Sequence, residues 1–553
     1  MGNEQSNTSG NPRRIIDCVY EDGSIDPTSY LMYQRSERQK RRKLDFQRVF
    51  EEALSLANKE SLVELTANRQ EHQKDKQKRT SKAQSASVHR NSEGEIVRMT
   101  WKDSSWYTLY VNPENIERNL QNKLFREKFR RRFRMPYESY TDLAVQLKDS
   151  SMFQRWTGMD ACGTHASPVE LLLLGSLRYL GRGWTFDDIE ESTVISREVH
   201  RNFFHVFIDW GSTVLFDKYV IAPSNADEAK IHEKEMALAG FPGSVGSGDA
   251  THVGMEKCSS WCSVNHSGPK LPMPSRTYNI VVNHRRRILS TTSGHPARWN
   301  DKTLQLFDKF MKGLYSGKNL SDFTFFLQER DASGKIHLAK YKGCWILVGN
   351  GYIHWATCMP PYKLHVKHSE IRWSKWLESM RKDVECTFGI LKGRFRILKS
   401  GIRTHGVETC DKIWHTCCAL HNLLLEVDGL EEGWEEGIPS SYQGEMGLHD
   451  VGLSETNLAV SRLFTPDQFM TFDASGMGPG NDVHDGRVVN EQVQELAFTH
   501  GGKTFAVGCE DERVVRELDF EYFRSRLVEH FDILFWQGKV VWPKRTGEAQ
   551  AVI

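Results

Sequence analysis

The sequence predicts an α/β protein in which an all-helical region precedes a mixed sheet, and a change in hydrophobic period is the main reason. Phe125, Phe129 and Phe133 recur at helical spacing, and 168–180 is a strongly apolar helix. From Phe241 onwards, short runs rich in β-branched and aromatic residues replace that pattern. We therefore expect helices first and an α/β domain after them.

Three predicted helices follow one another closely in the helical region. The apolar helix 168–180 comes first, and Thr185 then opens a short helix with Asp188 three residues on, as in a capping box. Ser196 opens the third helix. A short helix, a turn and a capped helix are typical of a helix-turn-helix, although an ordinary helical bundle has the same pattern. The predicted DNA-binding residues of the third helix are Arg197, His200 and Arg201.

The predicted α/β region has a distinctive order of elements. Three strands, a helix, a fourth strand and a late helix are expected at 241–253, 278–283, 288–292, 300–311, 343–348 and 381–399. This is the order of an RNase H-like core. Such a core carries one acid at the end of the first strand, one at the end of the fourth strand and one on the late helix.

The late helix is amphipathic, with a mainly cationic stripe that carries a single acid, Glu385. The stripe consists of Arg381, Glu385, Lys392, Arg396 and Lys399. One interpretation is a solvated helix face on which Glu385 pairs with Arg381 at i,i+4. The other is a metal-binding acid beside cations that contact a phosphate backbone.

Composition and charge indicate how the chain is divided into regions and in which cellular compartment it folds. The 553 residues carry a net charge of only +1, but basic runs such as 35–43 are local. Eleven cysteines without a secretory segment indicate a reducing compartment, and no apolar run reaches the ~18 residues that a membrane span needs. We expect a disordered basic tail (1–100), a helical region (101–235), a nuclease domain (236–430) and a low-order linker with a C-terminal helix (431–553).

The same features predict a nuclear protein. The basic cluster at 35–43 suits nuclear import. A cytoplasmic protein awaiting import is the alternative, and the start Met1–Ser6 fits the spacing of a myristoylation signal only weakly.

Residues from about 230 to 435 resemble a PIF/Harbinger-type DDE transposase, of the DDE superfamily endonuclease group. Several motifs carry the resemblance in the right order: GDATHV (248–253), NHRRRIL (283–289), RWNDKTLQLFD (298–308), NGYIHW (350–355), WLESMRKDVECTFGILKGRFRIL (376–398) and CCALHNLLL (417–425). The helix-turn-helix predicted above lies where this family carries one.

The resemblance implies a metal-dependent nuclease centre with one member missing. In the family, three carboxylates hold two Mg²⁺ or Mn²⁺ ions, which act on DNA phosphates. Asp249 matches the first acid and Glu385 the third, but Gly349 stands where the second Asp belongs. Asp301 belongs to the family's pattern and would help shape the site, although it is also an ordinary acid at a helix N-terminus. Glycine has no ligand atom, so the resemblance implies lost or impaired catalysis.

The expected function is therefore that of a DNA-binding, transposase-like protein with a defective nuclease centre. Alternatives are an active endonuclease in which Asp301 substitutes for the missing ligand, and a non-catalytic module that binds a partner. The expected partners are duplex DNA, a Myb-like DNA-binding protein of the kind that works with such transposases, and a second copy of the chain.

Overall fold

The computed structural model describes residues 88–90, 96–159, 166–431, 434–436, 494–496, 510–540 and 543–545. The chain divides into two units, 1–84 and 85–553, and all described residues belong to the second. The predictions for the N-terminal basic cluster and for the start of the chain lie outside the described residues. Within the stretch expected to be disordered, β1 (Val88–Arg90) and β2 (Ile96–Arg98) form an antiparallel pair.

The region after residue 100 is helical, as the sequence predicts. Its α-helices are α2 (Pro113–Leu120), α3 (Lys123–Phe133), α4 (Tyr137–Asp149), α5 (Val169–Arg182), α6 (Phe186–Thr193), α7 (Arg197–Trp210), α8 (Phe216–Tyr219) and α9 (Ala226–Leu238). Twelve of the 14 residues of α5 are buried, so this helix forms the centre of the region. Phe129, Phe133, Phe203 and Phe204 pack in the same core. Each such side chain stabilises the fold by about 1.5–3 kcal/mol.

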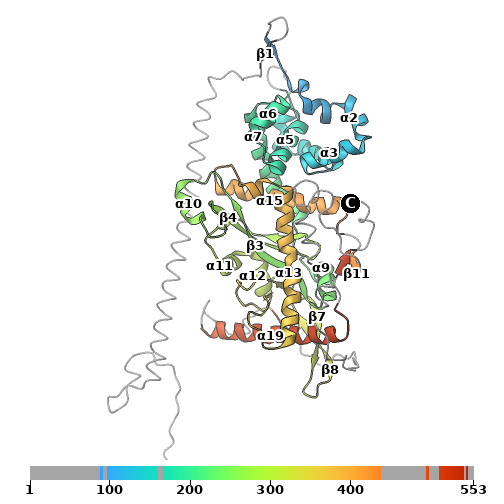
Figure 1. Ribbon diagram of the computed structural model, residues 1–553, viewed down its shortest axis with the longest axis vertical. Helices are drawn as coiled ribbons and strands as arrows, with labels where there is room; N and C mark the ends of the chain where they lie inside the picture. Colours follow the sequence, from blue (N-terminus) through green and yellow to red (C-terminus); the bar gives the residue numbers. More distant parts are fainter. Residues whose placement is uncertain are drawn as a thin grey trace, which may run out of the picture. The chain divides into compact units, whose positions relative to one another are not determined.

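A mixed sheet forms the centre of the α/β region, in the strand order β10-β9-β3-β4-β5. Figure 1 labels two of its strands, β3 and β4. Its strands are β3 (Ser244–Gly254), β4 (Ser275–Val282), β5 (Ile288–Thr291), β9 (Trp345–Leu347) and β10 (Cys358–Met359), with β6 (His295–Pro296) paired to β4. β3 is antiparallel to β4 and parallel to β9. β4 is almost wholly buried on both faces, which fits its run of β-branched residues.

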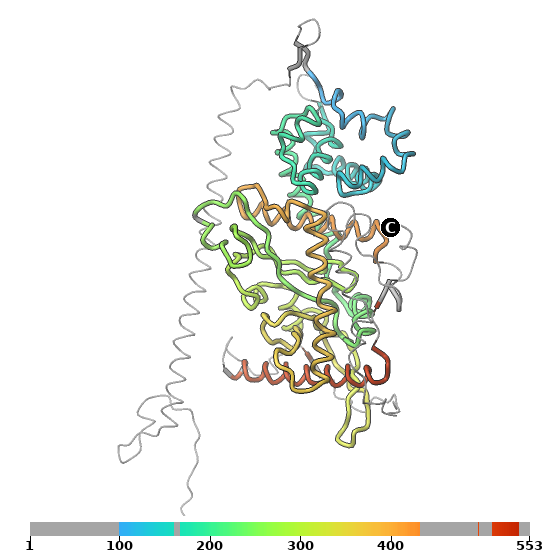
Figure 2. The backbone as a smooth tube through the Cα atoms, viewed as in Figure 1, coloured from blue at the N-terminus to red at the C-terminus, as the bar shows by residue number. Residues whose placement is uncertain are grey.

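The α/β region also contains α10 (Ser260–His266), α11 (Asp301–Phe307), α12 (Lys309–Tyr315), α13 (His368–Arg394), α14 (Ile397–Ser400) and α15 (Val407–Val427). Of these, α13 and α14 contact β3 and α15 contacts β5, and α9 also lies against β3. The single helix expected at 300–311 is two helices, because Asp308 ends α11 and its carboxylate caps α12 by accepting from the Met311 N–H at 2.9 Å. α13 passes over β3 and contacts it (Figures 1 and 2).

A second, smaller sheet and the C-terminal helix extend this core beyond what the sequence predicted. β7 (Thr324–Arg330) and β8 (Ile336–Lys342) form a hairpin to which β12 (Gln494–Glu495) adds in parallel. α19 (Glu510–Trp536) packs against β7 and α13, and its Phe520, Phe523 and Phe531 are buried in the core of the α/β region. A further pair joins β11 (Trp434–Glu436) to β13 (Pro543–Arg545). The expected C-terminal helix therefore spans Glu510–Trp536 and packs into the α/β core.

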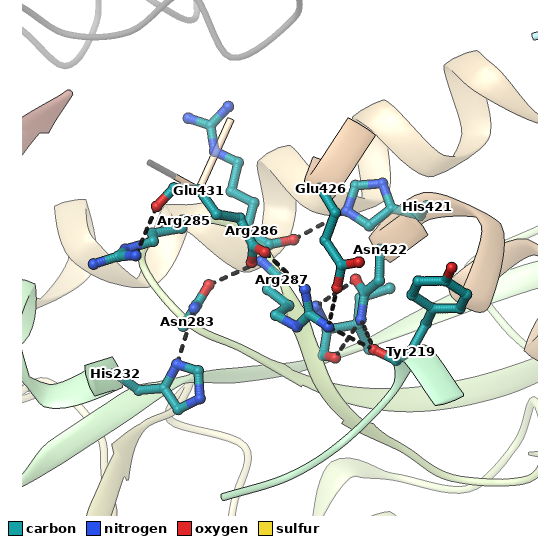
Figure 3. Close-up of polar contacts among 11 residues, drawn as sticks. Tyr219, His232, Asn283, Arg285, Arg286, Arg287, His421, Asn422, Glu426 and Glu431 are labelled. Atoms are coloured by element: carbon teal, nitrogen blue, oxygen red, sulfur yellow. Dashed lines mark hydrogen bonds and ion pairs between the residues drawn. The ribbon is translucent and has the colours of Figure 1, made fainter. Parts of the chain in front are cut away.

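The basic run 285–287 lies in the turn between β4 and β5 and is paired within the protein (Figure 3). Arg285 donates to Glu235 Oε1 at 3.0 Å and to the backbone oxygen of Glu431 at 2.7 Å. Arg287 donates to the Glu431 carboxylate at 2.7 Å. This run therefore holds neighbouring segments to the sheet and is not a separate cationic surface.

The same turn is fixed to α15 (Figure 3). Asn422 accepts from the backbone N–H of Ile288 at 3.0 Å and donates to the Ile288 oxygen at 2.8 Å. His421 contacts the Arg286 backbone oxygen at 3.0 Å. The two polar residues of the CCALHNLLL motif thus complete backbone hydrogen bonds at the end of the sheet.

Within the part of the chain that is described, no helix is both long and apolar enough to cross a bilayer.

Candidate functional site

Asp249 lies in the middle of β3 and not at its end, which corrects the sequence prediction. Thr251, His252 and Val253 continue the strand because they pair with β4. The parallel pairing with β9, however, ends at Ser247 opposite Leu347. Asp249 therefore stands just past the point where β9 stops, and this opens one side of the strand beside it.

The sequence places two glycines before Asp249, where strand formers are expected, and the structure explains both. A Cβ on Gly246 would lie 2.2 Å from the Val282 backbone oxygen. A Cβ on Gly248 would lie 2.7 Å from the Met311 side chain. Close packing of the β4 backbone thus requires glycine at 246, whereas a side chain at 248 would require the flexible end of Met311 to move.

Asp249 and Glu385 converge, as the sequence predicts, and one arginine joins them. From α13, Arg381 Nη1 donates to Asp249 Oδ2 at 2.9 Å, and Arg381 Nη2 donates to Glu385 Oε1 at 2.8 Å. The Arg381 side chain is only 18% exposed, whereas that of Glu385 is 47% exposed. The strand acid and the helix acid therefore share one guanidinium.

The predicted contact of Arg381 with DNA phosphates would have to compete with this geometry, and it stays a prediction. The Arg381 guanidinium is committed to two carboxylates, because α13 lies over β3 and brings the side chain onto Asp249. Burial raises the pKa of Asp249, and the charges of Asp301 and Glu385 raise it further. Arg381 and the Ala250 N–H oppose the rise. Arg381 thus stabilises the charged form of a half-buried acid.

Gly349 follows β9 by two residues and has free space around it. A Cβ added to Gly349 would meet no atom within 4 Å, and the φ of this residue is outside the left-handed region. Neither crowding nor backbone conformation therefore requires glycine here. The position has room for a Cβ, but the chain supplies no oxygen ligand from it.

Asp301 begins α11 and lies against the loop that follows Gly349. Its Oδ2 is 2.1 Å from where a Cβ of Gly351 would be, so only glycine permits this approach. Burial raises the pKa of Asp301, and Lys270 opposes that rise. Asp301 is thus a third acid in the neighbourhood of Asp249, although it comes from a helix and not from the fourth strand.

The residues present do not fit a two-metal centre. Among the described residues, no group of three or more His, Cys, Asp or Glu side chains is arranged to hold a metal ion. Divalent Mg²⁺ and Mn²⁺ prefer several oxygen ligands, and here Gly349 offers none while a guanidinium engages Asp249 and Glu385. The predicted ligand set of Asp249, Glu385 and Asp301 is therefore incomplete.

The cationic stripe of the late helix is divided in the structure. Lys392 donates to Thr251 Oγ1 at 2.8 Å and to the His252 oxygen at 2.9 Å, and burial lowers its pKa to about 8. Lys392 therefore binds β3 in this structure, and its contact with phosphate stays a prediction. Arg396 and Lys399 are exposed at the far end of the stripe. The sequence analysis did not identify Thr251, although the strand period of two places it on the same face of β3 as Asp249.

In the predicted helix-turn-helix, α6 and α7 are joined by residues 194–196. The predicted capping box is confirmed: Thr185 accepts from the Asp188 N–H, and Asp188 accepts from the Thr185 N–H. Ser196 precedes α7 but makes no side-chain cap. Glu190 instead accepts from the Arg197 N–H at 2.8 Å.

The three predicted DNA-binding residues of α7 differ in exposure. Arg197 is exposed but donates to Asp187 at 3.0 Å. Arg201 is half exposed. His200 is only 1% exposed and contacts Thr193 Oγ1 at 2.8 Å, and burial lowers its pKa to about 3. His200 is therefore a neutral core residue. Its prediction as a DNA contact is wrong, because the His200 side chain lies on the side of α7 that packs against α5.

Residues 249–422 match the protein family described as "DDE superfamily endonuclease". This segment, which contains Asp249, Glu385 and Asn422, is therefore similar to DDE superfamily endonucleases, and its curated relatives are consistent with the Harbinger type. Its relatives include the protein named "Putative nuclease HARBI1" from Mus musculus, 21% identical over 244 residues, and the protein of that name from Rattus norvegicus, 23% identical over 245 residues. Each match covers 43% of this chain and 62% of the relative. No solved structure gives a significant match.

Proposed function

We propose that the protein binds duplex DNA through a Harbinger-transposase-like domain whose nuclease centre is impaired because Gly349 replaces the second acid. One observation carries the proposal. Asp249 and Glu385 converge on Arg381, and Gly349 leaves open space where the family has its second acid. A side chain would fit there, but glycine supplies no ligand atom. The family match supplies the class of reaction and makes DNA the expected substrate.

We propose further that the domain has an RNase H-like core. The strand order β10-β9-β3-β4-β5 supports this, with β3 antiparallel to β4 and parallel to β9. In such a core the first strand, the end of the fourth strand and the late helix face one site. Here these elements are β3, the Gly349 segment and α13.

Charge explains why catalysis is impaired. In this family, divalent metal ions supply the Lewis acid that polarises the phosphate. The pair Asp249 and Glu385 carries two negative charges, and Arg381 already balances one of them. A divalent cation at this place would meet a fixed positive charge and one ligand fewer than a complete triad, so its binding is expected to be weak.

DNA contact is assigned to the cations that remain exposed. Arg396 and Lys399 are proposed to contact phosphates, and Arg201 is proposed to reach base edges from the first turns of α7. Arg197 would join it only by leaving Asp187, and an exposed ion pair of this kind costs little to break. A nuclear location, a Myb-like partner and self-association complete the proposal.

The proposal predicts metal-independent, salt-sensitive DNA binding in which Arg201 contributes sequence preference. Full-length protein should bind duplex DNA equally in EDTA and in Mg²⁺, with affinity falling steeply as salt rises. Arg201→Ala should change the ranking of sequences in a random duplex library, by about 1–3 kcal/mol at the positions contacted. The control is Arg155→Ala, an exposed arginine of the helical region that stacks on Trp156. An unchanged ranking would remove α7 from recognition, and absence of duplex binding would refute the proposed function.

The neighbourhood of Asp301 favours one alternative, an active endonuclease in which this acid substitutes for the missing ligand. Its charge acts on Asp249, and Gly351 leaves room for it. In that case the unmodified protein should nick DNA, and both Asp301→Asn and Gly351→Ala should abolish nicking. The second substitution tests position, because a Cβ at Gly351 must displace the Asp301 carboxylate.

A further inference from the structure

Three helices from distant parts of the sequence meet at the C-terminal end of α5. The backbone oxygen of Gly181, in the last turn of α5, accepts from Arg134 Nε at 3.3 Å and from the backbone N–H of Arg396 at 3.4 Å. Arg134 is the C-cap residue of α3, and Arg396 precedes α14. The helical region and the endonuclease domain are therefore in direct contact at this point.

Arginines from all three elements gather at the junction. Arg131 of α3 and Arg396 are exposed, and Arg182 at the end of α5 is half-buried. Burial lowers the pKa of Arg182, and the charges of Arg396 and Arg131 lower it further. Behind them, burial and four neighbouring arginines lower the pKa of Arg134 to about 9. Positive charge thus accumulates here both at the surface and beneath it.

Helix capping accounts for only part of this cluster. Arg134 and Arg403 donate to the backbone oxygens of Gly181 and Gly183, which a helix C-terminus leaves without internal partners. The side chains of the exposed pair, Arg131 and Arg396, have no such role. Within the described ranges, no carboxylate forms an ion pair with Arg131 or with the side chain of Arg396. Exposed arginines from separate elements held side by side form a cationic surface that suits an anionic ligand.

We propose that Arg131, Arg182 and Arg396, here called the junction cluster, bind backbone phosphates of duplex DNA. The inference rests on the proposed function and deepens it, because it places the phosphate contacts on a surface shared by the helical region and the endonuclease domain. Guanidinium groups bind phosphate oxygens bidentately, which suits a cluster made of arginine. Lys399, exposed on α14 and three residues after Arg396, extends the surface toward a further phosphate. DNA held here would be held by both regions of the protein together.

The test is the salt dependence of duplex binding by the full-length chain. Arg131→Gln/Arg396→Gln removes two exposed charges and should lower the slope of log affinity against log salt by about 2. The corresponding loss of affinity is roughly 30-fold at 0.15 M salt, equal for all sequences. Arg131→Lys/Arg396→Lys keeps both charges and should keep most of the slope. The matched control, Lys363→Gln/Lys367→Gln, removes two exposed charges before the opposite end of α13, and its slope should equal that of the unmodified protein.

The outcomes separate this inference from the function on which it rests. If the unmodified protein binds duplex DNA with a steep slope and the Arg131→Gln/Arg396→Gln variant keeps that slope, the junction cluster is not a phosphate site and DNA binding stands. An equal decrease in slope for the Lys363/Lys367 control would also overturn the assignment, because the effect would then reflect net charge alone. If the unmodified protein does not bind duplex DNA, both proposals are wrong.

Discussion

Gly349→Asp is expected to raise the affinity of the protein for Mn²⁺ by roughly 10²-fold or more, if the new ligand contributes about 3 kcal/mol. A Cβ at Gly349 meets no atom within 4 Å, so the new side chain should enter without displacing its neighbours. It would add a third negative charge to the two acids that Arg381 now bridges. The three carboxylates should then bind a divalent cation in preference to the guanidinium. Isothermal titration calorimetry of both proteins with Mn²⁺ measures the difference.

Two controls separate a ligand effect from an effect of charge or shape. Gly349→Asn has almost the same shape without the charge, and it should increase the affinity far less. Gly158→Asp adds the same charge at a glycine in the helical region that also has free space, and it should leave Mn²⁺ binding unchanged. Equal Mn²⁺ affinity in the unmodified protein and in Gly349→Asp would show that this position is not a ligand position.

Asp411→Ala is expected to destabilise the domain by about 3–5 kcal/mol, because it leaves a buried arginine without its counter-ion. Asp411 of α15 accepts from Arg276 Nε at 2.8 Å and from Nη2 at 2.7 Å, and from the Tyr278 hydroxyl at 2.8 Å. The Arg276 side chain is only 9% exposed. Urea unfolding should therefore show a much lower midpoint for the variant.

A surface ion pair between the next residue of α15, Lys412, and Asp209 of α7 provides the comparison. Lys412 contacts Asp209 at 2.8 Å, but the two side chains are 32% and 43% exposed. Asp209→Ala should therefore cost at most about 1 kcal/mol. The explanation by burial would be refuted if the two variants lost the same stability. Replacing Arg276 and Asp411 together by Met and Leu should recover part of the loss, since no charge is then left unpaired.

Local patterns in the sequence predicted much of the fold. The apolar run of α5, the capping box at Thr185 and the strand at 278–282 each follow from residues close in sequence. The hairpin of β7 and β8 was missed, although its turn signal, Asp331–Lys335, lies between two alternating segments. The break between α11 and α12 was also missed, because Asp308 resembles an ordinary helix acid until its carboxylate is seen to cap the next helix.

The site could be predicted only in part, because a side chain's partner depends on tertiary packing. Spacing and resemblance predicted that Asp249 and Glu385 would meet and that Gly349 would interrupt the set. They could not predict that Arg381 would lie between the two acids, since the i,i+4 rule offers Glu385 as its partner and gives no information on Asp249. His200 was assigned to the surface because it stands in the first turn of α7, but the packing of α5 against that turn buries it.

The central claim, an endonuclease fold without a working centre, is tested most directly by Mn²⁺-dependent nicking of supercoiled plasmid DNA. The unmodified protein and Asp249→Ala should nick at the same background rate. Gly349→Asp should exceed them by roughly 10²–10⁴-fold, the equivalent of about 3–5 kcal/mol at the transition state. The account is contradicted if the unmodified protein nicks as fast as Gly349→Asp and Asp249→Ala abolishes that activity, because the site would then be complete without residue 349.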